Sequence, residues 1–89
     1  MAGKILLVED DPGIATVIVT ALGDEGFDVD CVDSIASRDA RLADTSYSVM
    51  LTDVVLVDGD GLASLGAVRE RHPAMPVIVL SAHAGSWEC

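Results

Sequence analysis

Short apolar runs alternate with longer, more polar stretches along the 89-residue chain. Residues 4–8, 47–52 and 76–80 form runs that are too short for a helix and apolar enough for buried strands. Residues 27–32 alternate apolar and acidic side chains, which is typical of a strand that is more exposed to solvent than the other strands. The hydrophobic pattern therefore predicts four strands.

The clearest helix follows the first strand. Asp11 is a suitable N-cap, Pro12 suits the first helical position, and Gly26 is expected to end the helix. Its predicted apolar face consists of residues spaced by three and four: Ile14, Val17, Ile18, Ala21 and Leu22.

Two further helices are expected. Ser34 caps a helix over residues 35–43, whose small apolar face is Ala36, Ala40 and Ala43. Residues 54–61 are predicted to form a loop. The third helix then starts at Asp60 or Gly61, carries Leu62, Leu65 and Val68, and ends before Pro73.

Alternating strands and helices with continuous apolar strands predict one α/β domain with a parallel sheet. With right-handed crossovers and strand order 2-1-3-4, the first helix covers one face and the other two cover the opposite face. One helix is too narrow to cover four strands, so part of a face beside residues 47–52 and 76–80 is expected to be bare.

The net charge is −10, which disfavours direct binding to nucleic acid or anionic membranes. The N-terminal apolar run is too short for a signal peptide or a membrane span, so we expect a cytoplasmic protein. Cys31 and Cys89 have no metal-site spacing. Cys31 is interpreted as a small core residue and Cys89 as incidental.

Carboxylates follow two of the buried strands. Glu9 and Asp10 come after residues 4–8, and Asp53 ends the run 47–52. In a parallel sheet such ends face a ligand-binding crevice, so one acidic cluster is expected, with at least one raised carboxylate pKa. Carboxylates suit Mg²⁺, which can align an anionic nucleophile with a phosphoryl donor. The alternative is a solvated turn and a strand-end cap, and Asp58 and Asp60 are interpreted as turn formers.

The segments 4–12, 51–53, 60–61 and 77–82, in this order and at these strand ends, resemble the receiver domain of two-component response regulators. The resemblance implies a flavodoxin-like, doubly wound parallel sheet. Among response regulators, the sequence most resembles those of the nitrogen-regulation type, which controls transcription.

The resemblance also implies roles for individual residues. Asp53 corresponds to the phosphoacceptor, which takes a phosphoryl group from a histidine kinase. Glu9 and Asp10 correspond to residues that hold Mg²⁺ with Asp53, and the Val55 backbone carbonyl corresponds to a further ligand. Two residues after the last strand complete the set: Ser81, whose hydroxyl meets the phosphoryl group, and Ala82, which leaves it room.

The implied function is a phosphorylation switch, not an enzyme, that passes its signal to an output domain in a longer protein. The family has a fifth strand that ends in a lysine, whereas the only lysine here is Lys4. We therefore expect a receiver truncated after the fourth strand, over residues 1–84, with residues 85–89 as a non-native or disordered tail.

An exposed fourth strand predicts self-association as a homo-oligomer. The alternative function is a non-catalytic receiver fragment that assembles through this edge. A haloacid-dehalogenase-like phosphatase is disfavoured, because residues 53–55 lack the Asp-x-Asp motif.

Overall fold

The structure is a computed structural model that describes residues 3–56, 58–61 and 63–80. Its main sheet has four parallel strands in the order β2-β1-β3-β6, which confirms the predicted strand order. The strands are β1 (Lys4–Val8), β2 (Asp28–Val32), β3 (Val49–Asp53) and β6 (Val77–Leu80).

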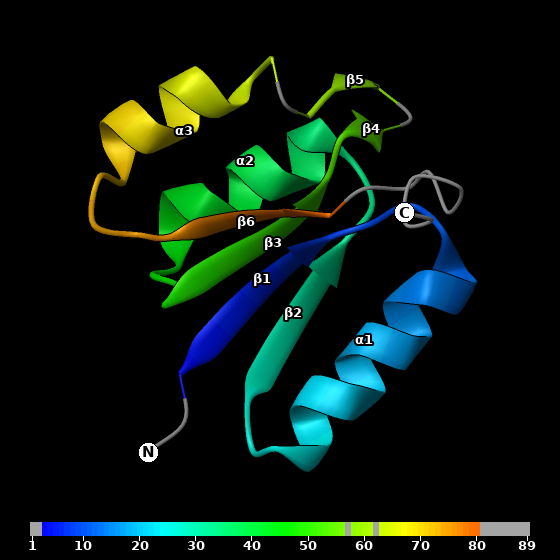
Figure 1. Ribbon diagram of the computed structural model, residues 1–89. Helices are drawn as coiled ribbons and strands as arrows, with labels where there is room; N and C mark the ends of the chain where they lie inside the picture. Colours follow the sequence, from blue (N-terminus) through cyan, green and yellow to red (C-terminus); the bar gives the residue numbers. More distant parts are fainter. Residues whose placement is uncertain (1–2, 57, 62, 81–89) are drawn as a thin grey trace, which may run out of the picture.

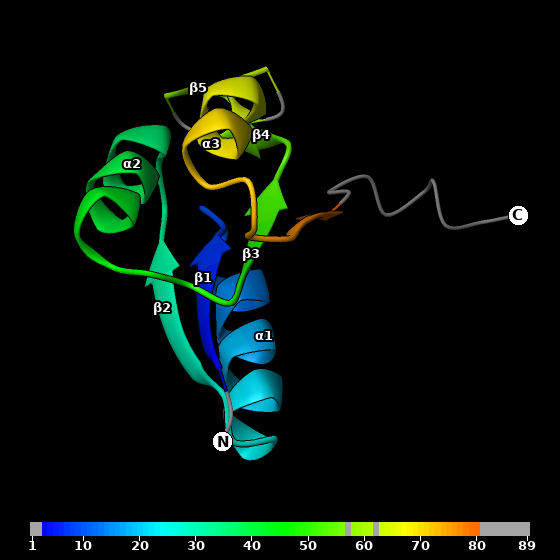
Figure 2. The same ribbon diagram turned by 90° about the vertical axis from the view of Figure 1, so that its left-hand side faces the viewer.

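The helices are α1 (Pro12–Asp24), α2 (Ile35–Asp44) and α3 (Leu65–Arg71). Helix α1 lies on one face of the sheet, and α2 and α3 lie on the other, as expected from right-handed crossovers (Figure 1, Figure 2). The Asp11 and Ser34 side chains cap α1 and α2 by accepting hydrogen bonds from first-turn N–H groups. In the described part of the chain, no helix is both long and apolar enough to cross a membrane.

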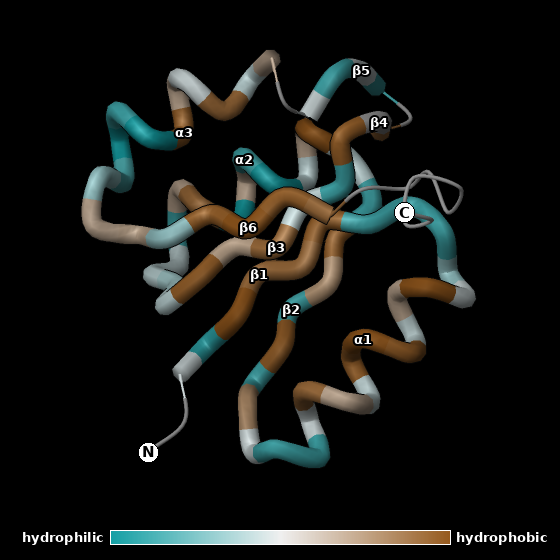
Figure 3. Tube along the Cα trace, viewed as in Figure 1, coloured by the Kyte–Doolittle hydropathy of each residue, from teal (hydrophilic) through white to brown (hydrophobic). Residues whose placement is uncertain are grey.

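The main hydrophobic core lies between the sheet and the face that carries α2 and α3. Side chains alternate along β1, so that Leu6 and Val8 enter this core while Ile5 and Leu7 are buried on the other side. Figure 3 shows β1 and β6 as hydrophobic along much of their length. The buried members of the core are Leu6, Val8, Val32, Leu42, Tyr47, Met50, Leu56, Leu65 and Val68.

The predicted buried face of α1 was wrong in part. Ile14 and Val17 are 43% and 68% exposed, whereas Ala15 is buried. Helix α1 is apolar on several sides, so periodicity alone could not decide which side meets the sheet. The inward face is displaced by one residue: Ala15 is buried, and Ile18, Val19 and Leu22 are partly buried.

The predicted alanine face of α2 was also wrong. Ala36, Ala40 and Ala43 are exposed, and the buried residues of this helix are Arg38 and Leu42. Arg38 is only 2% exposed, and this burial is tolerated because its guanidinium is paired with Ser64 and Asp39. A paired arginine can bury its long stem where an alanine would leave space.

Cys31 is exposed rather than part of the core. It lies on β2, an edge strand, where one side of the sheet has less cover. At the opposite edge, Ile78 and Val79 of β6 are 52% and 40% exposed. Because Val77 packs against the core, Ile78 points to the opposite face of the sheet, and its exposure agrees with the expected bare surface beside the last strand.

The segment after β3 differs from the predicted plain loop. It forms a small antiparallel ribbon of β4 (Val55–Leu56) and β5 (Gly59–Asp60). Helix α3 therefore starts later than expected, at Leu65. The Gly61 N–H donates to the Val54 carbonyl at 2.7 Å, and a Cβ at Gly61 would lie 2.6 Å from the Asp53 carbonyl oxygen. Residue 61 must therefore be glycine for this turn to pass so close to the end of β3.

A candidate magnesium site at the strand ends

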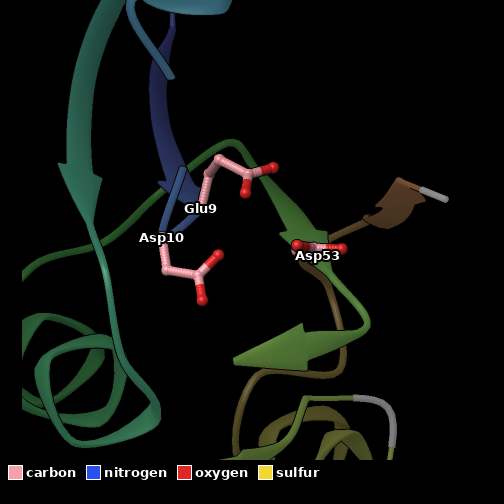
Figure 4. Close-up of side chains that lie close together, drawn as sticks. All are labelled: Glu9, Asp10 and Asp53. Carbon is pink, nitrogen blue, oxygen red and sulfur yellow. The ribbon is translucent and has the colours of Figure 1, made fainter. Parts of the chain in front are cut away.

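Three carboxylates gather at the carboxyl end of the sheet. One oxygen from each of Glu9, Asp10 and Asp53 lies within 4.8 Å of the others (Figure 4). The strand register explains this, because Val8 pairs with Thr52 and the next residue along each strand is Glu9 or Asp53. The structure thus brings together the three predicted acidic residues.

Local hydrogen bonds fix two of these side chains. The Val54 N–H donates to Oδ1 of Asp53 at 2.8 Å, and the Asp11 N–H donates to Oε2 of Glu9 at 3.1 Å. Asp11 itself is turned away as the cap of α1, where its Oδ1 accepts from the N–H of Gly13 at 2.8 Å. The backbone therefore orients two of the three carboxylates, those of Glu9 and Asp53, without a ligand.

The site is electrostatically crowded. Glu9 and Asp53 are 5% and 4% exposed, so little water screens their charges. Burial raises the pKa of Glu9 above its ordinary value, and the charges of Asp53 and Asp10 act in the same direction, while the Asp11 N–H opposes them. This agrees with the predicted raised carboxylate pKa, and a bound cation would relieve the repulsion.

The donor set fits magnesium. Three carboxylates offer hard oxygen ligands from one side and leave room for waters, which Mg²⁺ retains readily. The backbone of Val55, in β4, follows directly from the end of β3. Ser81 and Ala82, the other two predicted site residues, lie outside the described residues.

A groove of about 670 Å³ runs from the cluster between α1 and β2. Glu9 and Asp10 lie at one end, and Thr16, Cys31 and Asp33 are among its other lining residues. Glu9 and Asp10 of the acidic cluster therefore border this groove, and Asp53 is not among its lining residues.

Two residues with long-range contacts near the site were not recognised from the sequence. Asp58, expected to be a turn former, accepts hydrogen bonds from the N–H groups of Ile35 and Ala36 at 2.8 and 3.0 Å. These two N–H groups lower the pKa of Asp58. Arg38 is the other missed residue, and its guanidinium donates to the hydroxyl of Ser64, the residue that precedes α3. No local sequence signal indicates either role, because each depends on a partner more than twenty residues away.

Comparison with known proteins identifies the family. Residues 5–87 match the response regulator receiver domain family. The chain is 37% identical over 79 residues to the transcriptional regulatory protein PmrA of Pectobacterium parmentieri, covering 89% of this chain and 36% of that protein. It is 34% identical over 82 residues to the DNA-binding transcriptional regulator NtrC of Escherichia coli K12, covering 92% of this chain and 18% of NtrC. The likeness to NtrC agrees with the expected similarity to the nitrogen-regulation type.

Solved structures agree. A sensor protein from Polaromonas sp. JS666 superposes with a TM-score of 0.83 at 37% identity, covering 96% of this chain and 70% of that one. The response regulator MaeR bound to beryllium trifluoride superposes with a TM-score of 0.82 at 33% identity, covering 92% of this chain and 68% of MaeR. The family match, these likenesses and the flavodoxin-like sheet agree, and the chain belongs to the response regulator receiver domain family.

Proposed function

We propose that this chain is the phosphoacceptor receiver of a two-component phosphorelay and that Asp53 is the residue phosphorylated. The observation that carries the proposal is the buried Asp53 carboxylate, which lies at the end of a parallel strand within 4.8 Å of Glu9 and Asp10. In this proposal, Glu9, Asp10, Asp53 and the Val55 carbonyl bind Mg²⁺.

The chemistry is transfer of a phosphoryl group to a carboxylate. An oxygen of Asp53 forms a bond to phosphorus while the bond from phosphorus to the phosphohistidine nitrogen of a histidine kinase breaks. The electron pair of that bond stays with the imidazole, and the product is an acyl phosphate on Asp53. Mg²⁺, when bound, neutralises charge on the carboxylates and the phosphoryl oxygens.

The protein prepares Asp53 for this reaction. The Val54 N–H donates to Oδ1 at 2.8 Å, which orients the carboxylate. Burial of Glu9 and Asp53 limits water around the reacting group. Ser81 and Ala82 are proposed to contact the phosphoryl group and to leave it space, respectively.

The relatives support a proposal for the wider role. The chain spans 36% of PmrA and 18% of NtrC, both named as transcriptional regulators. We propose that this receiver likewise switches an output domain in transcription regulation, in the cytoplasm. In this role it acts as a signalling switch that is reset and reused, not as an enzyme.

Intact mass spectrometry tests the phosphoacceptor role. The chain is incubated with Mg²⁺ and acetyl phosphate, whose acetate leaves as Asp53 takes the phosphoryl group. We expect one added phosphoryl group in the wild type and in Asp24→Asn, an exposed acid at the C-terminal end of α1, and none in Asp53→Asn. Phosphorylation of Asp53→Asn, or its absence in folded wild type that binds Mg²⁺, would contradict the proposal.

The exposed edge at β6 supports a second, separate proposal of self-association. Ile78 and Val79 are half-exposed on an edge strand, which favours pairing with another β6. If assembly occurs without phosphorylation, the chain acts as a non-catalytic assembling fragment. Sedimentation velocity should show a dimer that Val79→Lys converts to monomer, and a wild-type monomer at high concentration would reject this proposal.

A further inference from the structure

Among the described residues between Asp53 and α3, the only strand pairing is a short ribbon. This ribbon pairs only two residues of β4 with two of β5, and isolated two-stranded ribbons are marginally stable. This segment nevertheless carries the backbone of Val55, a proposed Mg²⁺ ligand. Contacts from outside the ribbon must therefore help to determine where that backbone lies, and burial of the Leu56 side chain in the main core is one of them.

Asp58 provides such a contact at the tip of the ribbon. Its two carboxylate oxygens accept separate hydrogen bonds, from Ile35 N–H at 2.8 Å and from Ala36 N–H at 3.0 Å. Both donors belong to the first turn of α2, where N–H groups lack partners within the helix. A charged acceptor with two donors is a strong contact that fixes direction as well as distance.

Arg38 and Ser64 provide a second contact beyond the ribbon. The Arg38 guanidinium donates to the Ser64 hydroxyl at 2.7 Å, and that hydroxyl donates to the Gly61 carbonyl at 3.1 Å. Arg38 is itself held by Asp39, with Nη2 and Oδ1 at 2.8 Å. Helix α2 thus holds the ribbon at its tip and at its exit toward α3.

We propose that Asp58 is a positioning residue for the magnesium site, which acts by holding the β4–β5 ribbon against the first turn of α2. This inference rests on the proposed function. By the reciprocity of linked equilibria, metal binding at the acidic cluster stabilises the Asp58 contact with α2.

Helix α2 offers a matched control. Ser34 also caps its first turn, accepting from the Ser37 N–H at 3.1 Å, and its own hydroxyl donates to the Ser37 hydroxyl at 3.0 Å within α2 rather than to the ribbon. Ser34→Ala and Asp58→Ala each remove a capping side chain, and each should lower stability to a similar degree. Only Asp58→Ala releases the ribbon.

The test measures Mg²⁺ affinity by isothermal titration calorimetry on folded protein. For Asp58→Ala we expect affinity about tenfold weaker than wild type, a typical loss when an outer partner of a metal site is removed. For Ser34→Ala we expect wild-type affinity. The loss in Asp58→Ala should persist in 0.5 M KCl, where a mere change in the electrostatic field is screened.

Hydrogen exchange provides an independent readout. In wild type, added Mg²⁺ should slow amide exchange at Ile35 and Ala36, and in Asp58→Ala this slowing should disappear. Equal losses of affinity in both variants, a loss that salt abolishes, or unchanged affinity in Asp58→Ala would each overturn the inference. If wild type binds no Mg²⁺, the proposed function itself fails, which is a different result.

Discussion

Glu9 directly follows β1 and Asp53 ends the adjacent parallel strand β3, so that each lies one residue beyond the paired positions Val8 and Thr52. Both side chains are buried, and each places a carboxylate oxygen within 4.8 Å of the other. Two like charges at this distance and depth destabilise the metal-free fold. Under the proposed function, this loss of stability accompanies the ability of the site to bind a cation.

Replacing Glu9 with glutamine should change the stability of the metal-free protein and its Mg²⁺ affinity in opposite directions. Glu9→Gln removes one buried charge, so the free energy of unfolding without metal should rise by about 1 to 3 kcal/mol. Mg²⁺ affinity should fall at the same time, because a carboxylate ligand is lost. Urea unfolding at pH 7 in EDTA and in Mg²⁺ measures both effects, and a destabilised variant in EDTA would contradict the crowding argument.

Tyr47 should make stability depend on alkaline pH. Burial, helped by a 2.7 Å hydrogen bond that its hydroxyl donates to Asp30, raises its pKa from 10.0 to about 12. A raised folded-state pKa gives stability that is complete below pH 10 and lost as pH rises toward 12. Urea unfolding from pH 8 to pH 12 should therefore show a loss of about 2 kcal/mol from this group.

Tyr47→Phe is the corresponding control. It should be less stable than wild type by about 1 kcal/mol at pH 8, because the hydrogen bond is gone, and it should lack the alkaline loss. Tyr47 is the only tyrosine, so phenolate absorbance reports its ionisation directly. If the Tyr47 hydroxyl of the folded wild type ionised near pH 10, the argument that burial raises its pKa would be wrong.

Arg38 should matter for stability far more than an ordinary helical arginine. Arg38→Ala removes a fully buried side chain and the partner of Ser64, and should cost about 2 to 4 kcal/mol. Arg41, which is exposed on the same helix, provides the comparison, and Arg41→Ala should stay within about 0.5 kcal/mol of wild type. Chemical denaturation of both variants decides this, and equal costs would reject the burial of Arg38.

Gly61 and Gly66 should respond oppositely to alanine. A Cβ at residue 61 would meet the Asp53 carbonyl oxygen at 2.6 Å, so Gly61→Ala should cost about 1 to 3 kcal/mol and slow phosphorylation by acetyl phosphate. A Cβ at Gly66, within α3, meets nothing within 4 Å, so Gly66→Ala should add about 0.5 to 1 kcal/mol. Thermal unfolding with mass-spectrometric rates checks both variants, and a harmless Gly61→Ala would contradict the tight turn.

Local chemistry in the sequence was sufficient for much of the fold. The apolar runs marked the strands of the main sheet, and Asp11 and Ser34 marked helix starts because a cap bonds to its own first turn. The acidic cluster was also predictable, since Glu9, Asp10 and Asp53 end strands that a parallel sheet brings to one edge. These features depend on near neighbours or on a general rule of sheet topology.

Other features were decided only by tertiary packing. Which side of α1 meets the sheet, the exposure of Cys31 on an edge strand and the burial of Arg38 all depend on what covers each surface. Asp58 shows the same limit most clearly, because its partners Ile35 and Ala36 belong to a helix that lies more than twenty residues away in the sequence. The sequence by itself determined the four strands of the main sheet, the capped helices and the acidic strand ends. The tertiary structure alone decided the β4–β5 ribbon and the partners of Arg38 and Asp58, because charged side chains are satisfied by whichever groups folding brings within reach.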